Sequence, residues 1–276
     1  MNARAFAALA VAAVLAAGGC RAAGEPRTQA AMAKWLISGE AIALLAGAGM
    51  PQSELSTDFD VASTYLTVGG IDPVEYAKAV RTQSFTSLDA MRSALDHGLD
   101  QSVRAVLYDN EAWSLTPAAE QQDPAGAQSR AAELAHSHHL LLIATPATDL
   151  TRVLAPGENP YAAYLRLGIS AAAAKVADVI DIQAQGSESD TARYSDFVRG
   201  AAAAAHAANP HVVVLAGLST NPSGQSVTAG QLRAAVDATR SVVDGYWLNI
   251  PKAGKACPRC GTAQPQVAVA LLRQLS

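Results

Sequence analysis

The chain has 276 residues, of which half are hydrophobic and 16% are charged, and its formal net charge is −4. This composition supports a buried core and excludes a largely disordered chain. No long basic run and no interleaving of basic and aromatic residues occurs, so we expect no nucleic acid partner.

Residues 1–20 have the pattern of a secretory signal peptide. Arg4 precedes an apolar stretch that is too short for a comfortable membrane span, and small residues then lead to Cys20. The end of this segment resembles a bacterial lipobox, although Ala17 stands where a leucine is usual. We expect lipidation at Cys20, with simple cleavage near residues 21–23 as the alternative.

The signal predicts an exported protein. With a lipid on Cys20, the protein is held on the outer face of the cytoplasmic membrane, and this lipid is its only expected membrane contact; without the lipid it is secreted. Residues 21–33 are small and polar, and we interpret them as a flexible tether.

From about Lys34 to residue 276, strand-like and helix-like segments alternate, which predicts a single domain. The expected strands are residues 35–38, 64–68, 103–108, 140–145, 179–182, 212–215 and 245–250. Helices are expected at 87–96 and 267–275, and Asp123-Pro124 and Asn159-Pro160 look like an N-cap followed by proline in the first turn.

Successive strands without a hairpin signal favour a parallel sheet that is buried on both faces. A closed (β/α)8 barrel of the TIM type, with seven or eight strands and some irregularity, fits the length and the repeat of the units. An open doubly wound sheet is the alternative. No glycine-rich phosphate fingerprint follows the first strand, which removes the simplest argument for such a sheet.

In a barrel of this kind, functional residues gather where the strands end. The sequence places acidic, amide and aromatic residues at these ends. The candidate site residues are Asp109, Glu111, Trp113, Asp181, Gln183, Gln185, Asn221, Tyr246, Trp247 and Asn249.

Asp109 and Glu111 are the candidate catalytic residues. If the strand continues to Glu111, alternation puts both carboxylates on one face with Leu107. Two neighbouring carboxylates repel when both are ionised, so the pKa of at least one rises, and a protonated glutamate can donate its proton to a leaving group. The alternatives are a binding role and a structural role, in which the acids cap the following helix.

The remaining candidates suit carbohydrate binding. The amides of Gln183, Gln185, Asn221 and Asn249 both donate and accept hydrogen bonds, as sugar hydroxyls require, and Asp181 lies at the end of the same strand as the two glutamines. Aromatic rings at Trp113, Tyr246 and Trp247 offer flat faces for sugar rings. Trp247 can equally belong to the core.

Cys257 and Cys260 form a C-P-R-C motif in a loop rich in Lys, Gly and Pro. In an exported protein we expect them to form a structural disulfide. Half of a zinc site and a redox dithiol are the alternatives, but a zinc site needs two further ligands. His136 and His139 can share a helix face, yet no motif in the chain demands a metal or a cofactor.

Five segments resemble an exported actinobacterial family of proteins whose activity is uncharacterised. They are residues 108–124, 139–150, 177–185, 209–224 and 243–251. The D-x-E of Asp109 and Glu111 also resembles the catalytic strand of glycoside hydrolase family 18 barrels. That resemblance implies that Glu111 donates the proton and that Asp109 helps to position the acetamido group of the substrate. Upstream the chain departs from the family pattern, since Ala105 and Val106 stand where further acids are expected.

The sequence therefore predicts an exported carbohydrate-active barrel, a glycoside hydrolase with Glu111 as acid/base, whose partner is a carbohydrate or small polar ligand. A second carboxylate could come from Asp181, Asp149 or Glu40; otherwise the substrate itself assists. The alternatives are a surface lipoprotein that binds a glycan or small ligand without catalysis, and a purely structural envelope protein.

Overall fold

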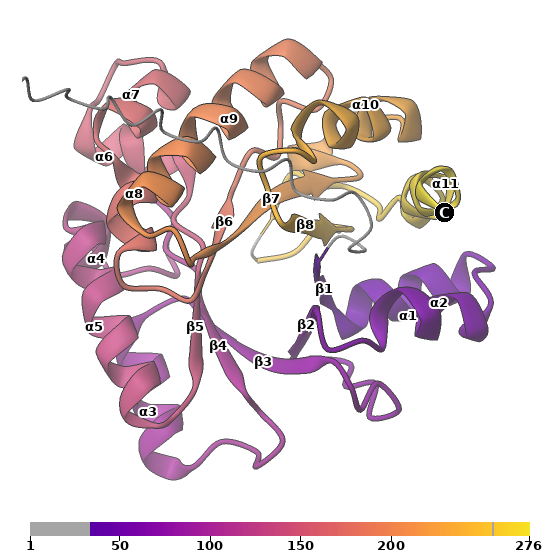
Figure 1. Cartoon of the computed structure of the whole chain (residues 1–276), viewed down its shortest axis with the longest axis horizontal. Coiled ribbons are helices and arrows are strands. Elements are labelled where there is room, and N and C mark those ends of the chain that lie inside the picture. Colours follow the sequence, from indigo (N-terminus) through magenta and orange to yellow (C-terminus); the bar gives the residue numbers. More distant parts are fainter. Residues whose placement is uncertain (1–33, 256) are drawn as a thin grey trace, which may run out of the picture. The chain divides into compact units, whose positions relative to one another are not determined.

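The computed structural model describes residues 34–255 and 257–276, and the predicted signal peptide, lipidation site and tether lie outside them. Eight parallel strands close into one barrel in sequence order, with β8 paired to β1 (Figure 1). The strands are β1 (Lys34–Ser38), β2 (Thr64–Val68), β3 (Val80–Phe85), β4 (Ala105–Tyr108), β5 (Leu141–Ala144), β6 (Val179–Ile182), β7 (Val213–Ser219) and β8 (Gly245–Asn249). The fold is a TIM barrel. This confirms the predicted fold class and excludes the open sheet.

Helices follow most strands and surround the barrel (Figure 1). They are α1 (Gly39–Gly47), α2 (Gln52–Phe59), α3 (Leu88–His97), α4 (Ala118–Gln122), α5 (Pro124–Ser137), α6 (Thr151–Leu154), α7 (Pro160–Arg166), α8 (Ile169–Ala174), α9 (Thr191–Ala208), α10 (Ala229–Thr239) and α11 (Pro265–Leu275), with 3-10 turns η1 (Thr148–Leu150) and η2 (Pro222–Gly224). In the described part of the chain, no helix combines the length and the apolar character that a membrane span requires.

Capping residues set several helix starts. The side chains of Asp123 and Asn159 accept hydrogen bonds from backbone N–H groups at the starts of α5 and α7, as the sequence predicted. Thr228 and Gln231 form a reciprocal capping box at α10. These caps satisfy N–H groups that have no partner inside the helix, so they fix where each helix leaves the barrel rim.

The connection from β2 to β3 departs from the usual pattern, because residues 69–79 contain no helix. The hydrophobic pattern of the sequence did not predict β3. Its outward-facing side chains include Arg81 and Gln83, and Arg81 pairs with Asp72 of the preceding connection. A strand that carries polar residues on its outer face lacks the continuous apolar run of a strand buried on both faces, which explains why it was missed.

Alternation along the strands separates two apolar cores. Leu36, Tyr65, Leu107, Ile143 and Leu215 belong to a cluster that fills the barrel interior. The intervening residues, such as Val106, Tyr108 and Ile180, belong to the larger cluster formed between the strands and the surrounding helices. The interior is therefore largely a packed apolar core, although it also holds buried polar residues such as Thr82 and Asp181.

Replacement of Gly245 by alanine tests the closure of the barrel. A Cβ at this position would lie 2.0 Å from the backbone oxygen of Lys34 on β1. We expect Gly245→Ala to lower the free energy of unfolding by about 1–3 kcal/mol, the usual cost of overpacking. Urea denaturation measures this change.

Gly47→Ala is the matched control, because a Cβ at Gly47 meets no atom within 4 Å at the end of α1. It should leave stability unchanged or raise it by up to about 1 kcal/mol. Equal effects of the two substitutions would contradict the proposed role of Gly245 in the contact between β1 and β8.

Candidate active site

Asp109 and Glu111 lie at the C-terminal mouth of the barrel. Asp109 directly follows β4 and shares the inward direction of Leu107. Its carboxylate Oδ1 accepts a hydrogen bond of 2.8 Å from the Thr145 hydroxyl and one of 3.0 Å from Nε2 of Gln183. The three residues follow the adjacent strands β4, β5 and β6, so strand order alone brings them together.

Glu111 belongs to the same cluster. Its carboxyl group is close enough to Asp109 and Asp149 for their charges to raise its pKa, and close enough to Gln183 to accept a hydrogen bond from the amide. Both Asp109 and Glu111 are partly exposed, and neither caps α4, whose N-cap is Pro117. The two acids are therefore close together at the mouth, and neither is used to cap the following helix.

The pKa values of the two acids differ, because hydrogen bonds offset much of the effect of burial at Asp109, whereas neighbouring charges add to it at Glu111. Burial, followed by the charges of Asp109 and Asp149, raises the pKa of Glu111 to about 9. Burial raises the pKa of Asp109 only to about 6, because the hydrogen bonds from Thr145 and Gln183 stabilise its ionised form. At neutral pH this arrangement favours an ionised Asp109 beside a protonated Glu111.

Asp181 lies deeper in the barrel, on β6, and is 1% exposed. Alternation with Val179 points it inward, and neither carboxyl oxygen has a hydrogen-bond partner among the described residues. Burial, followed by the charge of Asp109, raises the pKa of Asp181 well above the ordinary value. Its depth places it beneath the mouth instead of at a surface where substrate could contact it.

The loop that carries Glu111 is fixed by side chains that hold its backbone. Asp149 accepts a hydrogen bond of 2.8 Å from the backbone N–H of Ala112. The Thr116 hydroxyl accepts one of 2.7 Å from the indole N–H of Trp113, and Gln121 donates to the backbone oxygens of Trp113 and Thr116. Asp149 therefore positions the loop as well as adding negative charge near Glu111.

Gln185 and the β6–α9 loop form another side of the mouth. A Cβ at Gly217 would lie 2.3 Å from the Gln185 side chain, so the glycine on β7 leaves the space that this amide occupies. Glu188 is fully buried and accepts backbone hydrogen bonds from Ser219 at 2.8 Å and Gly186 at 2.6 Å. Burial raises the pKa of Glu188 to about 7, against the effect of these hydrogen bonds.

Trp113, Trp247 and Asn249 remain candidates for ligand contact, because all three are partly exposed. Trp247 packs against the interior cluster from β8, which makes it both a core residue and part of the inner wall. Asn249 ends β8 and has the same inward direction as Trp247. The sequence left open whether Trp247 is a core residue or a binding residue, and its position allows both roles at once.

Besides Asp181, two further predicted binding residues do not reach the mouth, and we correct the assignment of all three. Tyr246 is 1% exposed and points outward, where its hydroxyl donates to the backbone oxygen of Val236 in α10. Asn221 is also buried, and its amide donates to the backbone oxygens of Pro251, Cys260 and Thr262. Tyr246 supports helix packing, and Asn221 joins two loops.

Cys257 and Cys260 form a disulfide, as predicted for this motif. The disulfide lies in the loop that Asn221 holds. Glu40, considered as a second acid, lies at the start of α1 and pairs with Lys252. Within the described residues, no group of three or more histidine, cysteine, aspartate or glutamate side chains has the arrangement of a metal site.

Thr116, Gln121 and Glu188 were not identified as candidates from the sequence. Glu188 accepts a hydrogen bond from the backbone N–H of Ser219, which lies 31 positions further along the chain. Thr116 and Gln121 both form hydrogen bonds with Trp113, which is only a few positions away. The spacing of these bonds, however, follows no fixed motif. The only available signal was polar side chains near a strand end.

Comparison with known proteins supports the fold. Neither a protein-family model nor a curated protein sequence matches the chain. Among solved structures, a chitinase from Chromobacterium violaceum has a TM-score of 0.51 and 12% identity, over 88% of this chain and 99% of that chain.

Two further barrels are similar at lower TM-scores. A family GH18 chitinase catalytic domain from the fern Peteris ryukyuensis has a TM-score of 0.42 and 16% identity, over 76% of this chain and 72% of that chain. Triosephosphate isomerase from Bartonella henselae has a TM-score of 0.42 and 11% identity, over 78% of this chain and 92% of that chain. The structural neighbours thus include two chitinases, one of them of family GH18, and triosephosphate isomerase.

The raised pKa of Glu111 predicts a pH-dependent effect on stability. The pKa is about 9 in the folded chain and 4.5 for the free side chain, so between these values the folded state holds an additional proton. The free energy of unfolding therefore contains a contribution that is present below about pH 4.5 and is lost as the pH rises towards about 9. Glu111→Gln removes this loss, so its melting temperature should rise relative to wild type between pH 5 and pH 9.

Thermal unfolding followed by circular dichroism measures this difference. Glu133→Gln is the control, because Glu133 is exposed on α5, and its difference from wild type should not change with pH in this manner. A constant difference between Glu111→Gln and wild type from pH 5 to pH 9 would contradict the assigned protonation of Glu111.

Proposed function

We propose that this protein is an exported glycoside hydrolase, and that Glu111 is its general acid. The observation that carries the proposal is the pair of acids at the mouth. Thr145 and Gln183 stabilise the ionised form of Asp109, and burial together with the charge of Asp109 raises the pKa of the neighbouring Glu111. A glutamate that stays protonated at neutral pH can donate a proton to the oxygen of a glycosidic bond.

Asp109 has a complementary role in this proposal. Cleavage of a glycosidic bond develops positive charge on the sugar ring, and an ionised carboxylate close to that ring stabilises it. Asp109 cannot rotate freely, because its Oδ1 is held by two donors. The second oxygen of its carboxylate is the one that remains for substrate.

The second reacting group comes either from Asp149 or from the substrate. Asp149 is partly exposed and close to Glu111, but one of its oxygens already holds the backbone of Ala112. Asp181 is too deep for this role, and Glu40 is paired with Lys252. This leaves assistance by a substituent of the sugar as the simpler route, and it makes oligosaccharides with an acetamido group the first substrates to test.

Binding of the sugar is assigned to the other partly exposed groups of the mouth. Gln185 and Asn249 offer amide donors and acceptors, and Trp113 and Trp247 offer aromatic faces.

The proposal also includes the location of the protein. The signal-like residues 1–20 direct export, with a lipid on Cys20 as the proposed anchor.

Release of reducing ends from a panel of soluble glycans, with chitooligosaccharides included, tests the proposal. We expect turnover by wild type and a fall in kcat of at least about 100-fold in Glu111→Gln, because loss of a general acid typically costs that much. Binding of the same glycan by Glu111→Gln, measured by calorimetry, should stay within about threefold of wild type. Glu133→Gln should behave as wild type in both assays.

The alternative function is glycan binding without catalysis, which the same amides and aromatic rings favour. It predicts saturable binding by wild type with no release of reducing ends from any glycan of the panel. If the protein neither binds nor cleaves any glycan of the panel, both functions are contradicted and the structural role remains.

A pH profile of kcat/KM tests the separate roles proposed for Asp109 and Glu111. With ionised Asp109 and protonated Glu111 both required, the profile should be bell-shaped, with limbs near pH 6 and pH 9. Gln183→Leu removes a donor from Asp109, so its pKa should rise and the acidic limb should move to higher pH. An acidic limb that does not move in Gln183→Leu would contradict the assignment of that limb to Asp109.

A further inference from the structure

A cavity of about 450 Å³ lies at the end of the barrel opposite the mouth, next to the amino-terminal ends of β4 and β5. Helices α3 and α5 lie side by side here (Figure 1), and the segments that follow them, residues 98–104 and 138–140, lead into the two strands. Volumes of about 300–1,000 Å³ are typical of small-molecule sites. Because Arg104 directly precedes β4 and Asp109 directly follows it, the length of the strand separates this cavity from the proposed active site.

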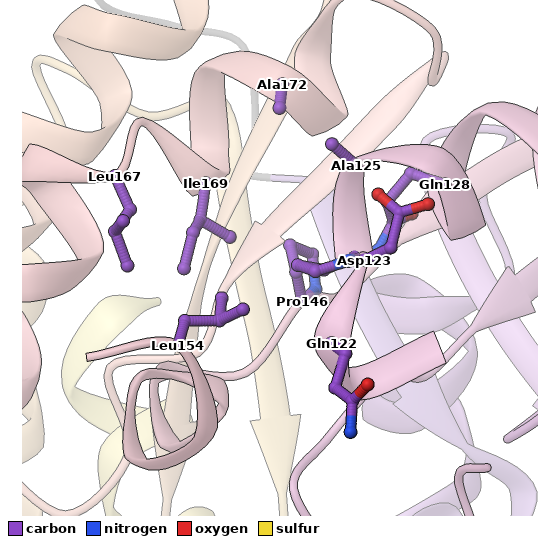
Figure 2. A pocket seen from close by; sticks show the side chains of 10 residues that line it. Gln122, Asp123, Ala125, Gln128, Pro146, Leu154, Leu167, Ile169 and Ala172 are labelled. Carbon is purple, nitrogen blue, oxygen red and sulfur yellow. The ribbon is translucent and has the colours of Figure 1, made fainter. Parts of the chain in front are cut away.

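A smaller cavity of about 140 Å³ lies between the α4–α5 junction and the α7–α8 region (Figure 2), and it offers less to a ligand. One wall is apolar and consists of Leu154, Leu167 and Ile169, and the carboxamide atoms of the buried Gln128 expose essentially no surface to it. The larger cavity differs from it, because the charged side chains of its lining are exposed.

Asp100 and Arg104 give the larger cavity one negative and one positive group. Oδ1 of Asp100 accepts hydrogen bonds from the backbone N–H of Ser102, at 2.8 Å, and from its hydroxyl, and these bonds lower the pKa of Asp100. Nη1 of Arg104 donates to the backbone oxygens of Gln101 and Val103. Each charge is thus held by the turn that carries it, but among the described residues neither forms an ion pair. Oδ2 of Asp100 and Nε and Nη2 of Arg104 therefore remain for a ligand.

His139 supplies an independent observation that points to a ligand. Its backbone φ is +57°, in the left-handed region, at the end of α5, where glycine is the usual residue. Its imidazole is exposed and has no hydrogen-bond partner among the described residues, so no contact inside the protein accounts for a histidine in this strained position. Strained residues other than glycine concentrate at sites that bind ligands.

We propose that this cavity binds a free α-amino acid with an apolar side chain. The ammonium group of the ligand contacts Asp100, and its carboxylate contacts Arg104 and His139. A ligand with a single charge would meet a like charge in the same cavity, whereas a zwitterion is attracted by both groups. The apolar side chain of the ligand contacts the leucines of the lining, which are Leu95, Leu99 and Leu140.

The probe for this proposal is L-leucine, and binding is measured by calorimetry and by NMR titration. We expect saturable binding to wild type. L-leucinamide lacks the carboxylate, N-acetyl-L-leucine lacks the ammonium group and glycine lacks the apolar side chain, so each should bind at least tenfold more weakly. Absence of saturable binding of L-leucine at millimolar concentration would overturn the proposal.

Variants of the two charged residues test the assigned contacts. Asp100→Asn keeps an oxygen for Ser102 but loses the charge, so it should bind L-leucine and N-acetyl-L-leucine equally weakly. Arg104→Gln should in the same way no longer distinguish L-leucine from L-leucinamide. Arg92→Gln is the control, because Arg92 is exposed on α3 outside the lining, and it should keep the affinity of wild type. Variants of Asp100 and Arg104 that discriminate between the probes as wild type does would overturn the proposal.

His139→Gly separates backbone strain from ligand binding. Glycine relieves the strain, so the melting temperature should rise by about 2–4 °C, while the affinity for L-leucine should fall at least fivefold. A rise in melting temperature with unchanged affinity would overturn the assigned contact of His139.

A zwitterionic lipid head group has related chemistry, and vesicles of phosphatidylethanolamine distinguish it from a free amino acid. We expect no binding of wild type to these vesicles beyond that of Arg104→Gln. Binding of wild type to the vesicles without binding of L-leucine would overturn the proposal and assign the cavity to a lipid.

Discussion

The functional arrangement depends on the two hydrogen bonds that fix the Asp109 carboxylate. Their donors, Thr145 and Gln183, follow β5 and β6, whereas Asp109 follows β4. Since these strands are parallel and adjacent, their carboxyl ends meet at one mouth, and no loop rearrangement is needed to assemble the contact. The bonds stabilise the charge of Asp109, and that charge adds to burial in making ionisation of Glu111 unfavourable.

Other polar groups of the mouth act by holding the backbone in place. Asp149 and Thr116 fix the loop that carries Glu111, and Glu188 joins the loop of Gln185 to the end of β7. Buried carboxylates are costly unless they accept hydrogen bonds, and Glu188 accepts two from backbone N–H groups. Asp181 has no such partner among the described residues, and burial raises its pKa well above the ordinary value.

The outer layer shows a different use of polar residues. Tyr246 and Asn221 were chosen from the sequence for the same reason as Gln185 and Asn249, namely their position near a strand end. Tyr246 faces the helices, because consecutive strand residues point to opposite faces, and its neighbour Trp247 takes the interior position. Gln128 belongs to this outer layer too, and it differs from Tyr246 in that its carboxamide has no hydrogen-bond partner among the described residues.

The sequence by itself determined the parallel barrel, seven of its eight strands, the caps of α5 and α7, and the two acids that follow β4. These features follow from local hydrophobic periodicity and from capping residues, which act over a few positions. Tertiary structure alone decided which polar side chains meet, because Asp109 and Gln183 are 74 positions apart and only barrel closure makes them neighbours. It also decided the protonation of Glu111, since a pKa depends on burial and on charges that distant segments contribute.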